Sequence, residues 1–132
     1  MIVDTSAVVA VVLGEEGFEA LARAIAFAST RRISAASILE GSIVVETRWG
    51  SSGIRQYDSF LREAALIVEP VSLDQVLIAR QGFSDYGKGR HPAGLNFGDC
   101  FAYALAKVTG EPLLFKGDDF RQTDITPALQ SA

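Results

Sequence analysis

Apolar and polar residues follow two different spacings along this chain. Four short runs of mostly apolar residues predict strands, at 1–4, 31–34, 66–71 and 112–115. Between these runs, apolar residues recur at steps of three and four, which predicts helices at 6–13, 15–29, 37–49, 52–65, 73–83 and 97–108. The segment 84–95 contains four glycines and prolines, so we expect it to be a loop.

Strands that alternate with helices predict a short parallel sheet with helices on both faces, a three-layer α/β/α domain. The chain has 132 residues and no linker rich in proline, glycine or serine, so we expect a single domain over 1–132. Ligands of such sheets bind beyond the carboxyl ends of the strands. Residues that directly follow a strand are therefore the first candidates for chemistry.

Composition and charge fit a soluble cytoplasmic protein. The chain is 48% apolar, and its net charge of −4 argues against a protein that holds nucleic acid by bulk positive charge. The single cysteine, Cys100, has no partner for a disulfide, and no cysteine–histidine cluster has zinc-ligand spacing. The longest apolar run, 7–13, is too short to cross a membrane.

Five carboxylates stand out by their positions. Asp4 ends the first predicted strand, just before a helix that Ser6 can cap, and Asp118 and Asp119 follow the last strand. Glu40 lies on a mostly apolar helix, where an unpaired charge is costly to bury. Taken singly, each acid has a structural explanation as a helix cap, a solvated charge or a turn residue, and Asp99 fits the third position of a capping box.

Together these acids predict a metal site. Carboxylates that the topology brings to one edge of the sheet repel one another in a poorly solvated cleft, unless a hard cation joins them. Ligation by oxygen alone suits Mg²⁺ or Mn²⁺, and such sites commonly carry out metal-assisted phosphodiester chemistry.

Four segments resemble the acidic motifs of PIN-domain ribonucleases and, more closely, those of the VapC toxins of bacterial type II toxin–antitoxin pairs. They are IVDTSA at 2–7, SAASILE at 34–40, LNFGDCFAYA at 95–104 and LLFKGDDF at 113–120. The resemblance implies a PIN-like domain in which Asp4, Glu40 and Asp99 are catalytic metal ligands. For the fourth acid the sequence offers two neighbours. We favour Asp118, with Asp119 beside the metals, because Asp118 emerges first from the strand.

The resemblance also implies a function and partners. It predicts a Mg²⁺- or Mn²⁺-dependent endoribonuclease toxin that hydrolyses RNA phosphodiester bonds and is neutralised by a cognate VapB-type antitoxin. The antitoxin is expected to lie across the acidic cleft and to insert an arginine there. A homodimer is expected as well.

Other interpretations of the same residues remain open. A catalytically inactive PIN-like module that binds RNA or protein is the main alternative, and a phosphoacceptor receiver domain or a haloacid-dehalogenase-type phosphatase fits the acid spacing less well. The segment 84–91 is either a solvated loop or, with its cations and Tyr86, a grip for single-stranded RNA. Trp49 and Tyr57 belong either to the core, which we favour, or to a partner surface. Cys100 is expected to be a small buried thiol.

Overall fold

The structure, a computed structural model, describes residues 1–130. Four strands form one parallel sheet in the order β3-β2-β1-β4: β1 (Ile2–Val3), β2 (Arg32–Ser34), β3 (Ile67–Glu69) and β4 (Leu113–Leu114). The helices are α1 (Thr5–Leu13), α2 (Phe18–Phe27), α3 (Ala35–Ala64), α4 (Leu73–Tyr86), α5 (Phe97–Thr109) and the short 3₁₀ helix η1 (Asp119–Gln122). Within this described part, no helix is long and apolar enough to cross a membrane.

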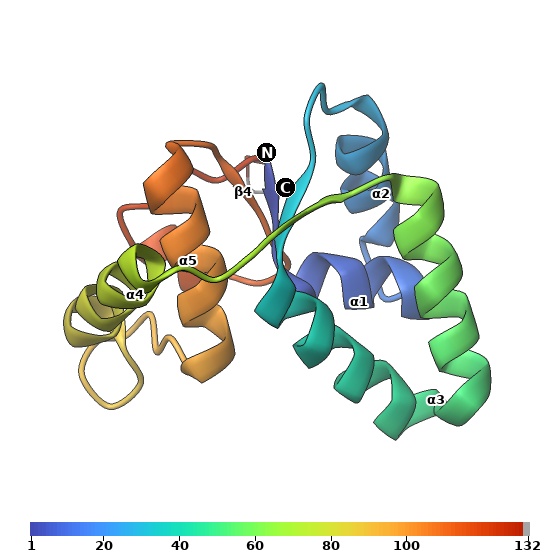
Figure 1. The fold of residues 1–132 in the computed structure, drawn as a ribbon, viewed down its shortest axis with the longest axis horizontal. Coiled ribbons are helices and arrows are strands. Elements are labelled where there is room, and N and C mark those ends of the chain that lie inside the picture. Colours follow the sequence, from blue (N-terminus) through green and yellow to red (C-terminus); the bar gives the residue numbers. More distant parts are fainter. Residues whose placement is uncertain (131–132) are drawn as a thin grey trace.

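The helices cover the sheet from two sides, as Figure 1 shows, with α4 and α5 on one side and α1, α2 and α3 on the other. Successive strand residues point to opposite faces. Ile2 and Leu113 accordingly pack in a core cluster with Leu105 of α5, whereas Val3 and Leu114 belong to the cluster formed with α1, α2 and α3. The predicted three-layer α/β/α fold is confirmed. The single-domain prediction for 1–132 remains a prediction, and its last two residues lie outside the described part.

Two predicted helix boundaries are wrong. Asp4, rather than Ser6, caps α1, because its carboxylate accepts a hydrogen bond from the Ser6 N–H. The helix α4 continues through 84–86, which were expected to be loop, because Tyr86 packs against Tyr103 with ring centroids 6.0 Å apart. Gly87 ends that helix at a point where an added Cβ would meet the Phe83 carbonyl oxygen.

The two halves of α3 form the arm that carries Glu40. Gly50 adopts φ 64° and ψ −152°, so the chain turns there and the second half of α3 runs back along the first. Tyr57, on the returning half, is buried as predicted. Trp49 was predicted to lie in the core but is 47% exposed, because it sits at the tip of the arm directly before the turn.

Candidate active site

Asp4 occupies the point where the strand order reverses. The strand β1 pairs with β2 on one side and β4 on the other, and a ligand site is expected beyond the carboxyl ends of strands at such a point. Asp4 follows β1 directly, and its backbone N–H donates to the Leu114 carbonyl of β4 at 2.9 Å. Its side chain is therefore fixed at the centre of the sheet edge, and the residue is only 3% exposed.

The two carboxylate oxygens of Asp4 have different surroundings. Oδ2 accepts hydrogen bonds from the backbone N–H of Ser6 at 3.0 Å and from its hydroxyl at 2.6 Å. Oδ1 is buried and has no hydrogen-bond partner among residues 1–130. An unsatisfied buried carboxylate oxygen costs free energy unless a ligand completes its coordination.

A pocket of about 410 Å³ joins Asp4 to the two other acids expected in the site. Glu40 reaches it from the first half of α3, and Asp99 reaches it from the first turn of α5. The complete lining is Asp4, Thr5, Ser6, Val9, Glu15, Glu40, Val44, Arg48, Asp99, Lys116 and Gly117. Three acids from distant parts of the chain therefore face one pocket.

Burial and neighbouring negative charges raise the pKa of two acids of the pocket, Asp4 and Asp99. Burial, as the largest cause, raises the pKa of Asp4 to about 7, and the negative charges of Asp99 and Glu40 contribute to the rise. The hydrogen bonds from Ser6 act in the opposite direction on this pKa. The pKa of Asp99 is also raised, first by burial and then by the charges of Glu40 and Asp119. Repulsion among like charges thus links these acids.

Asp99 combines a structural role with its place in the pocket. Its carboxylate accepts a hydrogen bond from the Asn96 N–H at 3.0 Å, and the Asn96 side chain accepts one from the Asp99 N–H at 2.9 Å. This is a complete capping box at the start of α5. The structural explanation considered for Asp99 is therefore correct, and it is compatible with a role in the site.

The two adjacent aspartates after β4 are both exposed, and neither lines the pocket. Gly117, with φ 98°, turns the chain before them, and Asp119 begins η1. Asp119 is the neighbour whose charge raises the pKa of Asp99. Which of the two is the fourth acid stays a prediction.

Three charged residues at the rim of the pocket were not identified from the sequence. Glu15 forms ion pairs with Arg48 at 3.1 Å and with Lys116 at 3.3 Å. Lys116 is held in place because its backbone N–H donates to the Ser6 hydroxyl at 3.0 Å. The position of Lys116 directly after a strand was the available signal, whereas nothing in the sequence links Glu15 to Arg48.

The acids of the pocket supply the oxygen ligands that a divalent cation prefers, although their carboxylates do not converge on one position. Among residues 1–130, no three histidine, cysteine, aspartate or glutamate side chains are arranged as a set that could hold an ion. Asp4, whose Oδ1 is buried without a partner among residues 1–130, nevertheless lines a pocket whose other acids supply only oxygen donors, the set that Mg²⁺ and Mn²⁺ prefer.

Two other candidates have structural roles. Tyr86 is half-buried against Tyr103 and His91, so it is not a free stacking surface, while Lys88 and Arg90 in the same segment are exposed. Cys100 is buried, as predicted, and burial raises the pKa of its thiol.

Known proteins define the class to which this fold and pocket belong. The family model described as PIN domain matches residues 1–125, and the chain therefore belongs to the PIN domain family. Within that family the chain is 51% identical to a protein named Ribonuclease VapC from Mycolicibacterium smegmatis, over 95% of this chain and 97% of the relative. It is 49% identical to Ribonuclease VapC30 of Mycobacterium tuberculosis, over 95% of each chain.

A solved structure supports the same fold. The crystal structure of Mycobacterium tuberculosis VapC20, described as a sarcin-ricin loop cleaving toxin, matches with a TM-score of 0.77 and 16% identity, over 95% of each chain. The resemblance to VapC-type PIN-domain ribonucleases found in the sequence is confirmed by the family match and by the curated relatives. These relatives do not favour the alternative of an inactive module.

Proposed function

We propose that this chain is an endoribonuclease toxin of the VapC type, which hydrolyses RNA phosphodiester bonds at the acidic pocket. The observation that carries the proposal is the buried, unpaired Oδ1 of Asp4 in a pocket shared with Glu40 and Asp99. The names of the curated relatives support ribonuclease activity. The test is to incubate RNA with the purified chain and with its Glu40→Gln variant. We expect cleavage by the wild-type chain alone, and equal cleavage by both would contradict the assignment.

We propose that the activity depends on Mg²⁺ or Mn²⁺ held by Asp4, Glu40 and Asp99, with Asp118 or Asp119 as the fourth acid. When bound, such an ion acts as a Lewis acid that lowers the barrier to phosphodiester hydrolysis. The residues of the chain hold the carboxylates in position for the ion. Ser6 fixes Oδ2 of Asp4, and the capping box fixes Asp99.

The basic side chains at the rim are suited to bind the RNA phosphate. Arg48 and Lys116 line the same pocket as the three acids, and both are paired with Glu15. A phosphate at the rim would take over these cations from Glu15, since both partners of each ion pair are partly exposed. The rim therefore gives an acidic pocket a local attraction for RNA despite the net charge of −4.

We propose a VapB-type antitoxin as the protein partner, bound across the acidic pocket. The exposed apolar side chains of Leu39 and Ile43 flank Glu40 on α3 and offer the antitoxin a hydrophobic contact. An arginine from the antitoxin would pair with the acids in place of a metal ion. Titration of Mn²⁺ into a preformed complex tests this arrangement. Competition between metal and antitoxin is expected, and independent binding of the two would contradict it.

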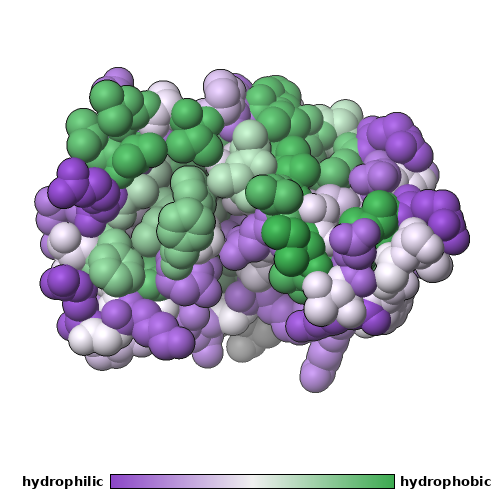
Figure 2. Space-filling view, turned by 60° about the horizontal axis from the view of Figure 1, so that its bottom comes forward, coloured by the Kyte–Doolittle hydropathy of each residue, from purple (hydrophilic) through white to green (hydrophobic). Residues whose placement is uncertain are grey.

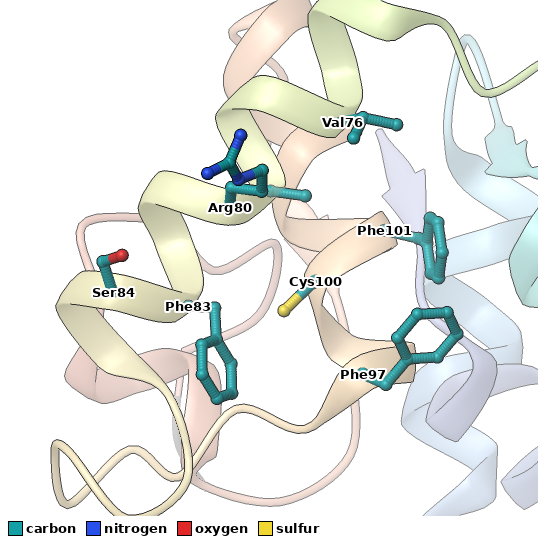
Figure 3. A pocket seen from close by; sticks show the side chains of 8 residues that line it. Val76, Arg80, Phe83, Ser84, Phe97, Cys100 and Phe101 are labelled. Carbon is teal, nitrogen blue, oxygen red and sulfur yellow. The ribbon is translucent and has the colours of Figure 1, made fainter.

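We propose that the chain forms a homodimer through the groove between α4 and α5. A pocket of about 650 Å³ lies there, and Figure 3 shows the rings of Phe97 and Phe101 close together beside Cys100. Figure 2 shows hydrophobic side chains over the half of the molecule that holds these helices, and further ones across its middle. The exposed apolar side chains include Leu73 and Leu77, and Phe97 is 80% exposed. A second copy would bury these side chains by presenting the same face.

The dimer is tested by light scattering after size-exclusion chromatography. We expect the wild-type chain to elute as a dimer and the Phe97→Ser variant to shift towards monomer. Phe27→Ser is a matched control, since Phe27 is equally exposed but lies at the end of α2. A monomeric wild-type chain, or a dimer that only the control variant weakens, would contradict the proposed interface.

A further inference from the structure

The carboxylate of Glu40 lies against the backbone of Gly98, one residue before Asp99. A Cβ atom added to Gly98 would overlap the Glu40 carboxylate, with Oε1 only 2.8 Å away and Oε2 closer still. Gly98 lies in the first turn of α5 and has no left-handed φ, so the backbone conformation does not require glycine. What the position requires is the absence of a side chain.

The two helices that meet at this contact are fixed independently of it. On the α3 side, the Tyr57 hydroxyl donates to the Ile38 carbonyl at 2.7 Å, and its ring lies over Gly41, next to Glu40. On the α5 side, the capping box and the buried Ala102 and Tyr103 hold the helix against the sheet. Of the atoms that meet at Gly98, the end of the Glu40 side chain is the part that shifts most easily. Any side chain at position 98 therefore has to displace the flexible end of Glu40.

We infer that Gly98 is a positioning residue for the proposed metal site, because it provides the space in which the Glu40 carboxylate is held beside Asp99. This inference rests on the proposed function, since it assigns Glu40 a ligand role. A substitution of Gly98 can therefore test metal binding without lowering the stability of the fold. Alanine is intrinsically better than glycine in a helix, so Gly98→Ala removes the space for Glu40 without a cost in helix propensity.

The experiment is calorimetric titration of Mn²⁺ into four purified chains: the wild type, Gly98→Ala, Glu40→Asp and the double variant. We expect Gly98→Ala to melt at or above the wild-type temperature while its Mn²⁺ affinity falls by roughly 10- to 100-fold. The double variant should bind Mn²⁺ more tightly than Gly98→Ala alone, since the aspartate is shorter by one methylene group and fits beside the alanine methyl.

The outcomes distinguish this inference from the proposed function. If the wild-type chain does not bind Mn²⁺, the metal site itself is wrong, and the role of Gly98 is overturned with it. If the wild-type chain binds Mn²⁺ and Gly98→Ala binds it equally well, only the inference is overturned. A Gly98→Ala chain that loses cooperative melting, or whose weakened binding Glu40→Asp does not improve, would show that the glycine serves packing and would also overturn the inference.

Discussion

The hydroxyl of Ser6 donates a 2.6 Å hydrogen bond to Oδ2 of Asp4, the most deeply buried acid of the pocket. The same hydroxyl accepts the Lys116 backbone N–H, so Ser6 joins the ends of β1 and β4 through one atom. Because the hydrogen bonds from Ser6 lower the pKa of Asp4, they oppose the effect of burial and favour the ionised form that a metal requires.

Ser6→Ala should therefore move the acidic limb of the pH–rate profile to higher pH. The variant loses the hydroxyl hydrogen bond but keeps the backbone one, so the pKa of Asp4 should rise further. The measurement is RNA cleavage across pH at subsaturating Mn²⁺. Thr109→Ala is the control, since that hydroxyl bonds at the other end of α5. An unchanged acidic limb in Ser6→Ala would mean that Ser6 does not tune Asp4.

Asp4→Asn should stabilise the metal-free chain at neutral and higher pH. The pKa of Asp4 is raised from 3.8 to about 7 on folding, so the folded chain holds its proton to higher pH than the unfolded chain. The free energy of unfolding of the wild type should accordingly fall as pH rises from about 4 to about 7 and then level off. Asparagine carries no charge, so it avoids the loss of stability that follows ionisation of the buried Asp4, and it can still accept the Ser6 hydrogen bonds.

The measurement is denaturant unfolding of both chains in chelator at pH 5 and pH 8. The stability advantage of Asp4→Asn should be larger at pH 8 than at pH 5 by roughly 3 kcal/mol. An advantage that does not depend on pH would contradict the assigned pKa shift.

Asp99→Asn separates capping from chemistry. The asparagine oxygen can still accept the Asn96 N–H, so the melting temperature should be close to that of the wild type while RNA cleavage falls by about 100-fold or more. Asp99→Ala loses the capping box as well and should be less stable by about 1 kcal/mol. Full activity together with a lowered melting temperature in Asp99→Asn would leave Asp99 with the capping role alone.

Asn variants of the two adjacent aspartates identify the fourth acid. The sequence order favours Asp118 as the fourth acid, because it comes first after the strand. In the structure, however, it is the charge of Asp119 that raises the pKa of Asp99. We expect the cleavage rate at saturating Mn²⁺ to fall more in Asp119→Asn than in Asp118→Asn. A large loss confined to Asp118→Asn would restore the choice made from the sequence, and equal losses would assign both residues to the site.

Sequence patterns predicted those parts of the molecule that depend on local spacing and strand order. The predicted α/β/α layers follow from alternating strands and helices, and the positions of Asp4 and Asp99 in the pocket follow from strand ends and helix caps. The exposure of Trp49 was missed because it depends on the turn at Gly50, which fixes where the arm of α3 ends.

Contacts between distant segments left no signal in the sequence. The contact between Glu40 and Gly98 joins α3 to α5. The ion pairs of Glu15 join the loop after α1 to Arg48 of α3 and to Lys116 in the loop after β4. Such contacts depend on how the helices pack against the sheet, which hydrophobic periodicity does not specify. The full extension of α4 depends likewise on the packing of Tyr86 against α5.

Cleavage of RNA at the acidic pocket with a divalent cation is tested by removing the cation with a chelator and adding it back. Purified wild-type chain is treated with EDTA, assayed on RNA, and assayed again after Mn²⁺ or Mg²⁺ is added in excess, with Glu40→Gln in parallel as a control for contaminating nuclease. We expect no cleavage in EDTA, recovery with either ion, and no cleavage by Glu40→Gln under any condition. Full cleavage by the wild-type chain in EDTA, with none by the variant, would contradict it.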